Sequence, residues 1–258
     1  MGFLQAIIRK FGVQVSPNDP LVAKCHQRLI RDEMSDKEPR EAPQSLSGFY
    51  VKEIDKSEAK PIILKYEWLG TMPKITRFCY GLFSPEDEIH GVACFGMGNG
   101  TLAGNITTAE IAKPICLERG ACVHYSHPHA PSFLVANACR KAYEEKGFNV
   151  FYAYSDKEAG EIGTIYQACN WYYLGVSPGR ASKYRYKYRN LFTGEVLSSR
   201  TARSKVKRGE FHEPAWEKIK DYGKGKYCWF EGSKSEKKKL RAGLRYPALI
   251  YPKRVTKN

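Results

Sequence analysis

The sequence predicts an α/β (α+β) protein with a mixed sheet flanked by helices, an N-terminal helical arm and a basic C-terminal extension. Strand-like and helix-like segments alternate through the middle of the chain, which is typical of a sheet with crossover connections. The 258 residues are 42% hydrophobic and 13% aromatic, which is enough for one core domain with extensions. No run of about 18 apolar residues occurs, so no membrane span is expected.

The first 47 residues are predicted to form a helical arm and a linker. Asn18-Asp19-Pro20 is a typical helix start, and Leu21, Cys25 and Leu29 recur on one helical face. Residues 35–47 are charged and contain proline, which indicates a linker between this arm and the body of the protein.

Residues 48–190 form the predicted core domain. Apolar runs bounded by turn residues predict strands, and Pro131 stands at a helix start, where its missing N–H costs nothing. The helix that follows ends at Gly147, a common C-terminal cap. The predicted strands cover 49–51, 77–83, 89–96, 114–123, 149–154 and 171–174, and the predicted helices cover 58–68, 131–146 and 160–169.

The positive charge is concentrated in the last third of the chain. Residues 180–258 hold 23 Lys and Arg against 7 Asp and Glu, a net charge of +16, whereas residues 1–179 hold 19 against 20. A neutral body with a basic appendage suits a protein that binds a polyanion. Because no amphipathic helix with a wide apolar face accompanies the charge, nucleic acid is favoured over an anionic membrane.

Residues 191–258 are therefore predicted to be a basic nucleic-acid-binding extension, and their scattered aromatic residues indicate that it packs on the core. Ahead of it, residues 182–189 alternate Tyr with Lys or Arg, which is the period of a half-buried strand. The candidate phosphate contacts, which fix position rather than read sequence, are Lys183, Arg185, Lys187, Arg189, Arg203, Lys205, Lys207, Arg208, Lys237, Lys238, Lys239 and Arg241.

The eight cysteines are scattered without a Cys-x-x-Cys pair, and most lie in apolar runs. Such cysteines behave as small buried hydrophobes, so reduced thiols and a cytoplasmic location are expected. His124, His127 and His129 form a close trio, but their spacing matches no strong ligand motif. They are the candidate metal ligands, and the metal content stays open.

The order strand pair, strand, proline-started helix, strand, helix, strand resembles the centre of the GNAT acetyltransferase fold, which implies a mostly antiparallel sheet. Ile165-Tyr166-Gln-Ala-Cys-Asn-Trp171 resembles the Leu-Tyr-x-x-x-Gly-Phe segment of these enzymes. There the tyrosine protonates the departing thiolate, so the resemblance implies a catalytic Tyr166. The alternative is an interior tyrosine whose hydroxyl has found a partner.

Residues 117–128 resemble the buried GNAT strand that leads into the pyrophosphate loop, where backbone N–H groups at a helix start bind the phosphates of the cofactor. The glycine-rich pattern expected next is replaced by His129-Ala-Pro-Ser132-Phe-Leu. The helix start is kept, but the glycines are not. The resemblance thus implies acetyl-CoA or another acyl or glycyl donor, with Ser132 as a binding residue.

Three segments together are similar to the Mom family of phage proteins, which modify adenine in DNA and so protect it from restriction. They are residues 66–73, 117–120 and 154–171, and the similarity is most specific over residues 152–175. It covers residues 48–190 well and the tail loosely. It implies a transferase in the host bacterial cytoplasm that converts the N6 amine of adenine in double-stranded DNA into a carbamoylmethyl (acetamido-type) derivative.

Asp156, at the end of a predicted strand, is the first candidate for catalysis. Adenine N6 is a poor nucleophile because its lone pair is delocalised into the ring, and the base must leave the stack to react. Asp156 is expected to accept the N6 proton or to hydrogen-bond the edge of the base. A helix-capping aspartate is the alternative.

Glu67 and Trp68 occupy the place of a polar–aromatic pair in the family, with Glu67 the second acidic candidate for catalysis. Trp68 is expected to stack on an extruded adenine or to pack in the core. Thr164 and Gln167 flank the candidate tyrosine, and are expected to orient the base or the donor.

Arg119 stands in an otherwise apolar strand, where an arginine seldom stays unpaired. It is expected to meet a carboxylate, Glu118 or Asp156, or an anionic group of the substrate. Two other functions stay open at this point. One is a GNAT-type transferase that uses an aminoacyl-tRNA or acyl-CoA donor on another substrate, and the other is a non-catalytic GNAT-like protein that only binds nucleic acid.

Overall fold

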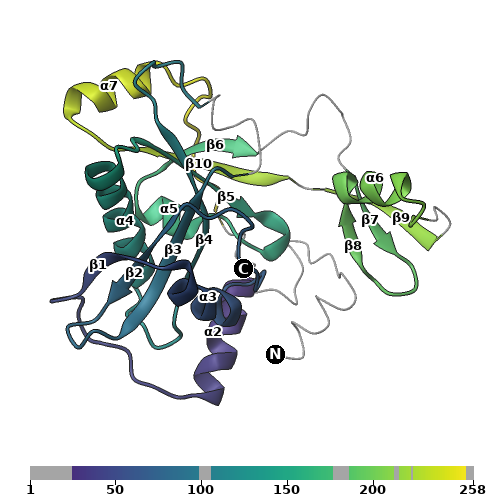
Figure 1. The fold of residues 1–258 in the computed structure, drawn as a ribbon, viewed down its shortest axis with the longest axis horizontal. Coiled ribbons are helices and arrows are strands. Elements are labelled where there is room, and N and C mark those ends of the chain that lie inside the picture. The colour runs from purple at the N-terminus through teal and green to yellow at the C-terminus, as the bar shows by residue number, and fades with distance from the viewer. Residues whose placement is uncertain (1–24, 99–105, 177–185, 212–214, 222, 254–258) are drawn as a thin grey trace.

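The computed structural model describes residues 25–98, 106–176, 186–211, 215–221 and 223–253 (Figure 1). No helix within these ranges is long and apolar enough to cross a membrane. In chain order the elements are α2 (His26–Lys37), β1 (Tyr50–Ile54), α3 (Lys56–Tyr66), β2 (Phe78–Phe83), β3 (Ile89–Gly96), β4 (Pro114–Cys122), α4 (Ala130–Lys146), β5 (Val150–Asp156), η2 (Lys157–Ala159), α5 (Thr164–Ala168), β6 (Tyr172–Val176), β7 (Tyr186–Asn190), β8 (Val196–Ser198), α6 (Ser199–Lys207), β9 (Trp216–Lys220), β10 (Lys224–Phe230) and α7 (Lys234–Ala242).

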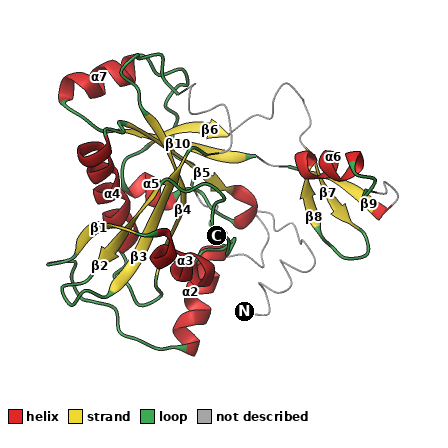
Figure 2. Cartoon of the chain, in the orientation of Figure 1, coloured by secondary structure: helices red, strands yellow, loops and turns green. Residues whose placement is uncertain are grey.

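The main sheet has seven strands in the order β1-β2-β3-β4-β5-β10-β6 (Figure 2). Every neighbouring pair is antiparallel except β4 and β5, which run parallel. Helix α4 connects these two strands, as a parallel pair requires a crossover. The predicted mixed, mostly antiparallel sheet flanked by helices is confirmed.

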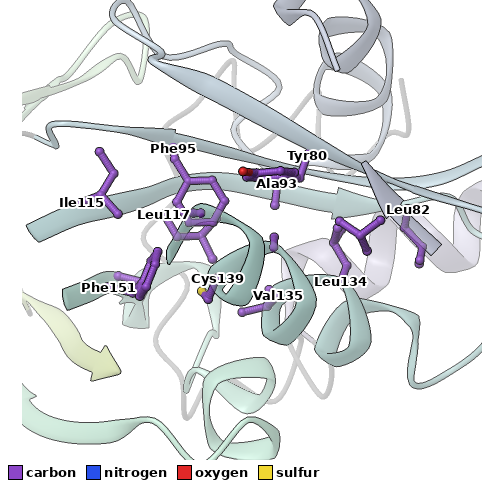
Figure 3. Packing of buried hydrophobic residues seen from close by; sticks show 14 of the residues in the cluster. Tyr80, Leu82, Ala93, Phe95, Ile115, Leu117, Leu134, Val135, Cys139 and Phe151 are labelled. Carbon is purple, nitrogen blue, oxygen red and sulfur yellow. The ribbon is translucent and has the colours of Figure 1, made fainter. Parts of the chain in front are cut away.

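Helix α4 covers one face of the main sheet. Its side chains Leu134, Val135 and Cys139 face the sheet residues Phe95 and Phe151, and all five are buried (Figure 3). Pro131 lies in the first turn, where no N–H bond is lost, and Gly147 ends the helix with a left-handed φ of 74°. This is the helix that the proline and glycine positions predict.

Helix α3 lies against the opposite face, where Ala59 and Ile63 are fully buried against β2, β3 and β4. Its first turn is closed by a capping box between Asp55 and Glu58, which satisfies backbone N–H groups that a helix start leaves without partners. The helix ends at Tyr66, so Glu67 follows directly as its C-cap.

A small basic module, residues 186–220, is inserted between β6 and β10. It contains a separate three-stranded sheet, β8-β7-β9, and helix α6, and it stands beside the main body (Figure 1). The predicted boundary between residues 190 and 191 therefore does not match the structure. Strand β7 belongs to the module, whereas β10, well inside the predicted extension, lies in the middle of the main sheet.

One predicted element needs correction, and another lies outside the described residues. The predicted helix over 160–169 is shorter, because η2 and a turn through Gly160 and Gly163, both with positive φ, precede α5. The predicted helix start at residues 18–20 lies outside the described residues, and the arm is described from α2 onward.

Candidate functional site

Strands β4 and β5 pair over only three residues each and then separate. The pairing joins residues 114–116 to residues 150–152, although β4 continues to Cys122 and β5 to Asp156. We call residues 117–122 and 153–156 the fork. Among the described strands, β4 pairs along the fork with β3, and β5 pairs there with β10, so that β4 and β5 no longer pair with each other. Strand edges that separate in this way offer backbone N–H and C=O groups to a ligand.

A β-bulge lies on the β4 side of the fork. In the pairing with β3, Cys94 lies opposite Arg119 and Phe95 lies opposite Leu117, so Glu118 is the extra residue. Bulges redirect side chains and are frequent beside active sites. The Glu118 carboxylate turns back toward β3, where Oε1 accepts the N–H of Gly98 at 3.0 Å.

Arg119 reaches from β4 to the end of α3. Its Nε donates to the carbonyl oxygen of Thr71 at 3.2 Å and lies 3.9 Å from Oε2 of Glu67, while Nη1 donates to the carbonyl oxygen of Glu118 at 2.7 Å. Arg119 thus forms an ion pair with Glu67, whereas the sequence led us to expect Glu118 or Asp156.

Asp156 ends β5, and the turn after it brings Glu161 alongside. The Glu161 N–H donates to the Asp156 carbonyl at 3.0 Å, and the Asp156 N–H donates to Oε2 of Glu161 at 3.3 Å. Gly160 makes this tight return possible with a φ of 69°. From β10, Lys224 places Nζ 3.2 Å from Oδ2 of Asp156. Two carboxylates and one ammonium group therefore meet at the end of the fork.

Among the acids of this site, Glu161 has a pKa raised to near neutrality. Burial raises its pKa from the ordinary value to about 7, an effect strengthened by the negative charges of Glu67 and Asp156 and opposed by the Asp156 N–H and Lys224. Burial also raises the pKa of Glu67, while Arg119 and two backbone N–H groups oppose that rise. A carboxyl group whose pKa lies near neutrality is suited to accept and release protons.

Tyr166, on α5, faces the same group of acids. Its ring lies 5.1 Å from both Trp171 and Tyr227. Burial raises the pKa of the Tyr166 hydroxyl, and the negative charges of Glu161 and Glu67 raise it further. The hydroxyl therefore stays protonated at neutral pH and can serve as a proton donor.

Trp68 lies beside the fork, partly exposed, with its indole edge-on to His26 of α2 at a centroid distance of 5.9 Å. His26 is only 6% exposed, and burial lowers its pKa while Asp156 opposes that change. Its buried Nε2 has no hydrogen-bond partner. Sequence reasoning missed His26, since a lone histidine on an amphipathic helix carries no motif.

The remaining predicted binding residues serve different purposes. Thr164 is the exposed first residue of α5. Gln167 donates to the carbonyl oxygens of Ile162 at 2.7 Å and Pro252 at 3.2 Å, so its amide ties α5 to the C-terminal segment. Ser132 donates to the carbonyl oxygen of His129 at 3.0 Å within the first turn of α4.

The histidine trio does not converge on a common point. Nε2 of His124 bonds the carbonyl oxygen of Glu38 at 2.5 Å, and its Nδ1 lies 3.3 Å from the hydroxyl of Tyr66. Nδ1 of His127 accepts the N–H of His129. Over the described ranges, no group of three or more His, Cys, Asp or Glu side chains is placed to hold a metal ion.

A cavity of about 300 Å³ lies away from the fork, between the linker and the β2–β3 turn. Arg40 forms two hydrogen bonds to the Glu88 carboxylate across it, and Tyr125 stacks under Arg40 and bonds the same carboxylate. Arg40 and Glu88 thus neutralise each other in this cavity. The fork remains the site with an unusual concentration of acids.

The predicted phosphate contacts fall into two places. Lys187 and Arg189 lie on β7 and four more lie on or directly after α6, all in the basic module, whereas Lys237, Lys238, Lys239 and Arg241 lie on α7 in the main body. Lys183 and Arg185 lie outside the described residues.

The Mom protein family profile matches residues 48–253, which is most of the chain and includes every element of the fork. The chain belongs to the Mom protein family. A search of curated proteins gave no match.

Solved structures with a similar arrangement are acetyltransferases of low sequence identity. A Bacillus subtilis acetyltransferase in complex with CoA has 11% identity and a TM-score of 0.38, covering 71% of this chain and 98% of that one. A ribosomal-protein-S5-alanine acetyltransferase from Vibrio fischeri has 11% identity and a TM-score of 0.35, covering 71% and 93%. A spermidine/spermine N-acetyltransferase from Vibrio cholerae has 7% identity and a TM-score of 0.40, covering 76% and 98%.

The loop before α4 lacks the glycine-rich pattern of a loop that binds the diphosphate of coenzyme A. The N–H groups of Ser126, Ala130 and Phe133 bond carbonyl oxygens of the loop itself, and that of His129 bonds the ring of His127. Residues 128 and 131 are prolines without an N–H, and no glycine stands between residues 123 and 146. These bonded N–H groups and the two prolines leave fewer backbone donors for an anion than a glycine-rich loop presents.

Proposed function

We propose that this member of the Mom family is a transferase that modifies the N6 amine of adenine in double-stranded DNA. The observation that carries the proposal is the group of acids at the fork: Asp156, Glu161 and Glu67, set against Lys224 and Arg119. The resemblance in sequence implies that the product is the carbamoylmethyl derivative, formed in the cytoplasm of the host bacterium.

Glu161 is the proposed proton acceptor. Attack by N6 forms a bond from nitrogen to the donor carbon and breaks the bond from that carbon to its leaving group. One N–H proton passes to the Glu161 carboxylate, and the leaving group departs with a proton from Tyr166. A base whose pKa lies near 7 is ionised often enough to act and still binds the proton well. General-base catalysis of this kind contributes about 10²- to 10⁴-fold to a rate.

The other charged groups position the reactants. Lys224, 3.2 Å from Asp156, keeps that carboxylate oriented at the end of β5, where it accepts a hydrogen bond from the edge of the extruded base. Glu67 and Arg119 link α3 to β4 and hold the opposite side of the fork. Trp68 is placed to stack on the base, and Tyr166 to give a proton to the leaving group.

The donor is an acyl or aminoacyl compound bound in a way that does not depend on a diphosphate loop. Simple acyl transfer places a carbonyl directly on N6, whereas the product implied by the resemblance carries its amide one carbon away. An aminoacyl-tRNA donor is favoured over acetyl-CoA by one observation, the occupied N–H groups of the loop before α4.

Restriction of plasmid DNA tests the proposed function in living cells. Plasmid recovered from bacteria expressing the wild-type protein should resist endonucleases whose recognition sites contain adenine. Plasmid from cells expressing Glu161→Gln should be cut, because the acceptor of the N6 proton is lost. Glu53→Gln is the matched control, since Glu53 is a surface carboxylate on β1 that pairs with Lys146 of α4. Full cutting of the wild-type plasmid, with the protein soluble and expressed, would contradict the proposal.

A further inference from the structure

The turn between β7 and β8 presents a large apolar side chain to solvent. Phe192 is 84% exposed and the preceding Leu191 is 58% exposed. Both stand at the tip of the basic module, away from the hydrophobic clusters of the main body. The two adjacent side chains form a small apolar patch on a projecting turn, which another molecule can cover.

The turn that carries Phe192 is rigidly built. Oδ1 of Asn190 accepts the N–H groups of both Phe192 and Thr193 at 2.9 Å. The Gly194 N–H returns to the Asn190 carbonyl at 2.9 Å, with a φ of 71° that suits glycine. The phenyl ring is therefore held out on a fixed backbone, and little entropy is lost when it inserts into a partner.

The module that carries this tip has a positive net charge, and the cations nearest the turn form ion pairs, Lys205 with Glu195 and Arg189 with Glu217. Residues 186–220 hold nine Lys and Arg against four Asp and Glu, a formal net charge of +5. The end of α6 lies at the same end of the module as the turn, because Nζ of Lys205 is 3.4 Å from Glu195. The first residue of β9, Trp216, pairs with Asn190 at the base of the turn. An apolar turn at the end of the β7–β8 hairpin, in a module of positive net charge, resembles the wedges that some proteins insert between base pairs.

We propose that Phe192 inserts between base pairs of double-stranded DNA. That the nucleic acid is double-stranded DNA rests on the proposed function. Phe192 is the residue that would help to open the base stack of that DNA. Extrusion of an adenine leaves a gap in the stack, and a planar ring that fills the gap replaces part of the lost stacking. Leu191 widens the apolar wedge, while the cations of β7 and α6 bind the flanking phosphates.

Unwinding of a closed circular plasmid tests this inference without knowledge of the target sequence. A nicked plasmid is sealed by DNA ligase in the presence of the full-length protein, the protein is removed, and the linking number is read from the topoisomer distribution. A side chain inserted between base pairs unwinds the duplex, so the wild-type protein should lower the linking number in proportion to the amount bound.

The variants separate insertion from binding. Phe192→Ala should lose most of the unwinding and bind duplex DNA about tenfold more weakly, with an unchanged dependence of affinity on salt because the phosphate contacts remain. Phe192→Trp should keep the unwinding. The matched control is Ile250→Ala, which removes an apolar side chain that is 90% exposed on the main body. Unchanged melting temperatures establish that the variants are folded.

Each outcome bears on one proposal. Unwinding that Phe192→Ala retains would overturn the inference, and so would adenine modification by a wild-type protein that leaves the linking number unchanged. Tighter binding of tRNA than of duplex DNA, without unwinding, would also overturn it. Unwinding that depends on Phe192, in a protein that never modifies adenine, would support the inference and count against the proposed function.

Discussion

Glu161 is the residue in which the chemistry of the site is most concentrated. It follows Asp156 by five positions, and the backbone turn between them returns its carboxylate to the end of β5. Two neighbouring acids and burial make its ionised form unfavourable, which is why its pKa rises to about 7. A carboxylate of this kind lowers the stability of the folded protein whenever it is charged.

The pH dependence of stability tests this description of Glu161. Its pKa is raised in the folded state. The contribution of Glu161 to the free energy of unfolding is therefore most favourable below the pKa that it has in the unfolded chain, and it is lost as the pH rises through about 7. Glu161→Gln should therefore raise the melting temperature at pH 8.5 by about 2–4 °C, which corresponds to about 1 kcal/mol after allowance for partial exposure. The gain should shrink toward pH 5, as followed by thermal unfolding. A gain that is equal at both pH values would show that the charge of Glu161 is not the cause.

At the scale of elements, the start of α5 decides where Tyr166 lies. Gly163 precedes the helix with a φ of 71°, and a Cβ there would lie 2.4 Å from the ring of Tyr227. Both the backbone and the space at this position require glycine. The α5 segment is thereby fixed against β10, with Tyr166 between them.

Substitution at this glycine should displace α5. Gly163→Ala is expected to destabilise the protein by the cost of a left-handed alanine, about 1–2 kcal/mol, plus about 1–3 kcal/mol for the clash with Tyr227. Gly209→Ala is the control, because Gly209 has a φ of 70° and nothing within 4 Å of an added Cβ. Denaturant unfolding measures the free energy of unfolding of both variants. Equal losses for the two variants would contradict the role given to the contact with Tyr227.

Sequence patterns predict those elements whose signals are local. The strand over 89–96 matches β3, and Pro131 and Gly147 mark α4 to within a residue. Strand β10 was missed because residues 177–223 separate it from β6. No pattern in its own sequence shows that the chain returns to the main sheet. Lys224 was missed for the same reason, and Glu161 because only the folded turn brings it beside Asp156. The sequence motifs do predict Asp156, Glu67 and Tyr166 as site residues.

At the scale of the whole molecule, the positive charge that lies in one basic tail of the sequence is divided between different parts of the structure. The predicted extension contributes β10 to the core, a module to one side, and α7 against the main sheet (Figure 1). Positive charge therefore lies on two distinct bodies of structure. The module combines it with the projecting Phe192, whereas α7 buries Leu240 and keeps its lysines outward.

Salt titration of DNA binding tests the contribution of the module. Lys205, Lys207 and Arg208 changed together to Gln should weaken binding to duplex DNA of any sequence, and should reduce the slope of log affinity against log salt by about 2–3. The matched control changes Lys52, Lys60 and Lys65 to Gln, which removes the same charge from β1 and α3. Equal reductions in the two variants would show that net charge, rather than the module, governs binding.

Mass spectrometry of nucleosides tests the central claim most directly. DNA from bacteria that express the wild-type protein should yield a deoxyadenosine derivative of increased mass, absent from cells that express Glu161→Gln and present with Glu53→Gln. The added mass distinguishes a carbamoylmethyl group from an acetyl group, and fragmentation of the nucleoside distinguishes it from the N6-glycyl isomer of equal mass. Unmodified deoxyadenosine in cells that hold abundant, folded wild-type protein would contradict the assignment of the fork as a site of DNA modification.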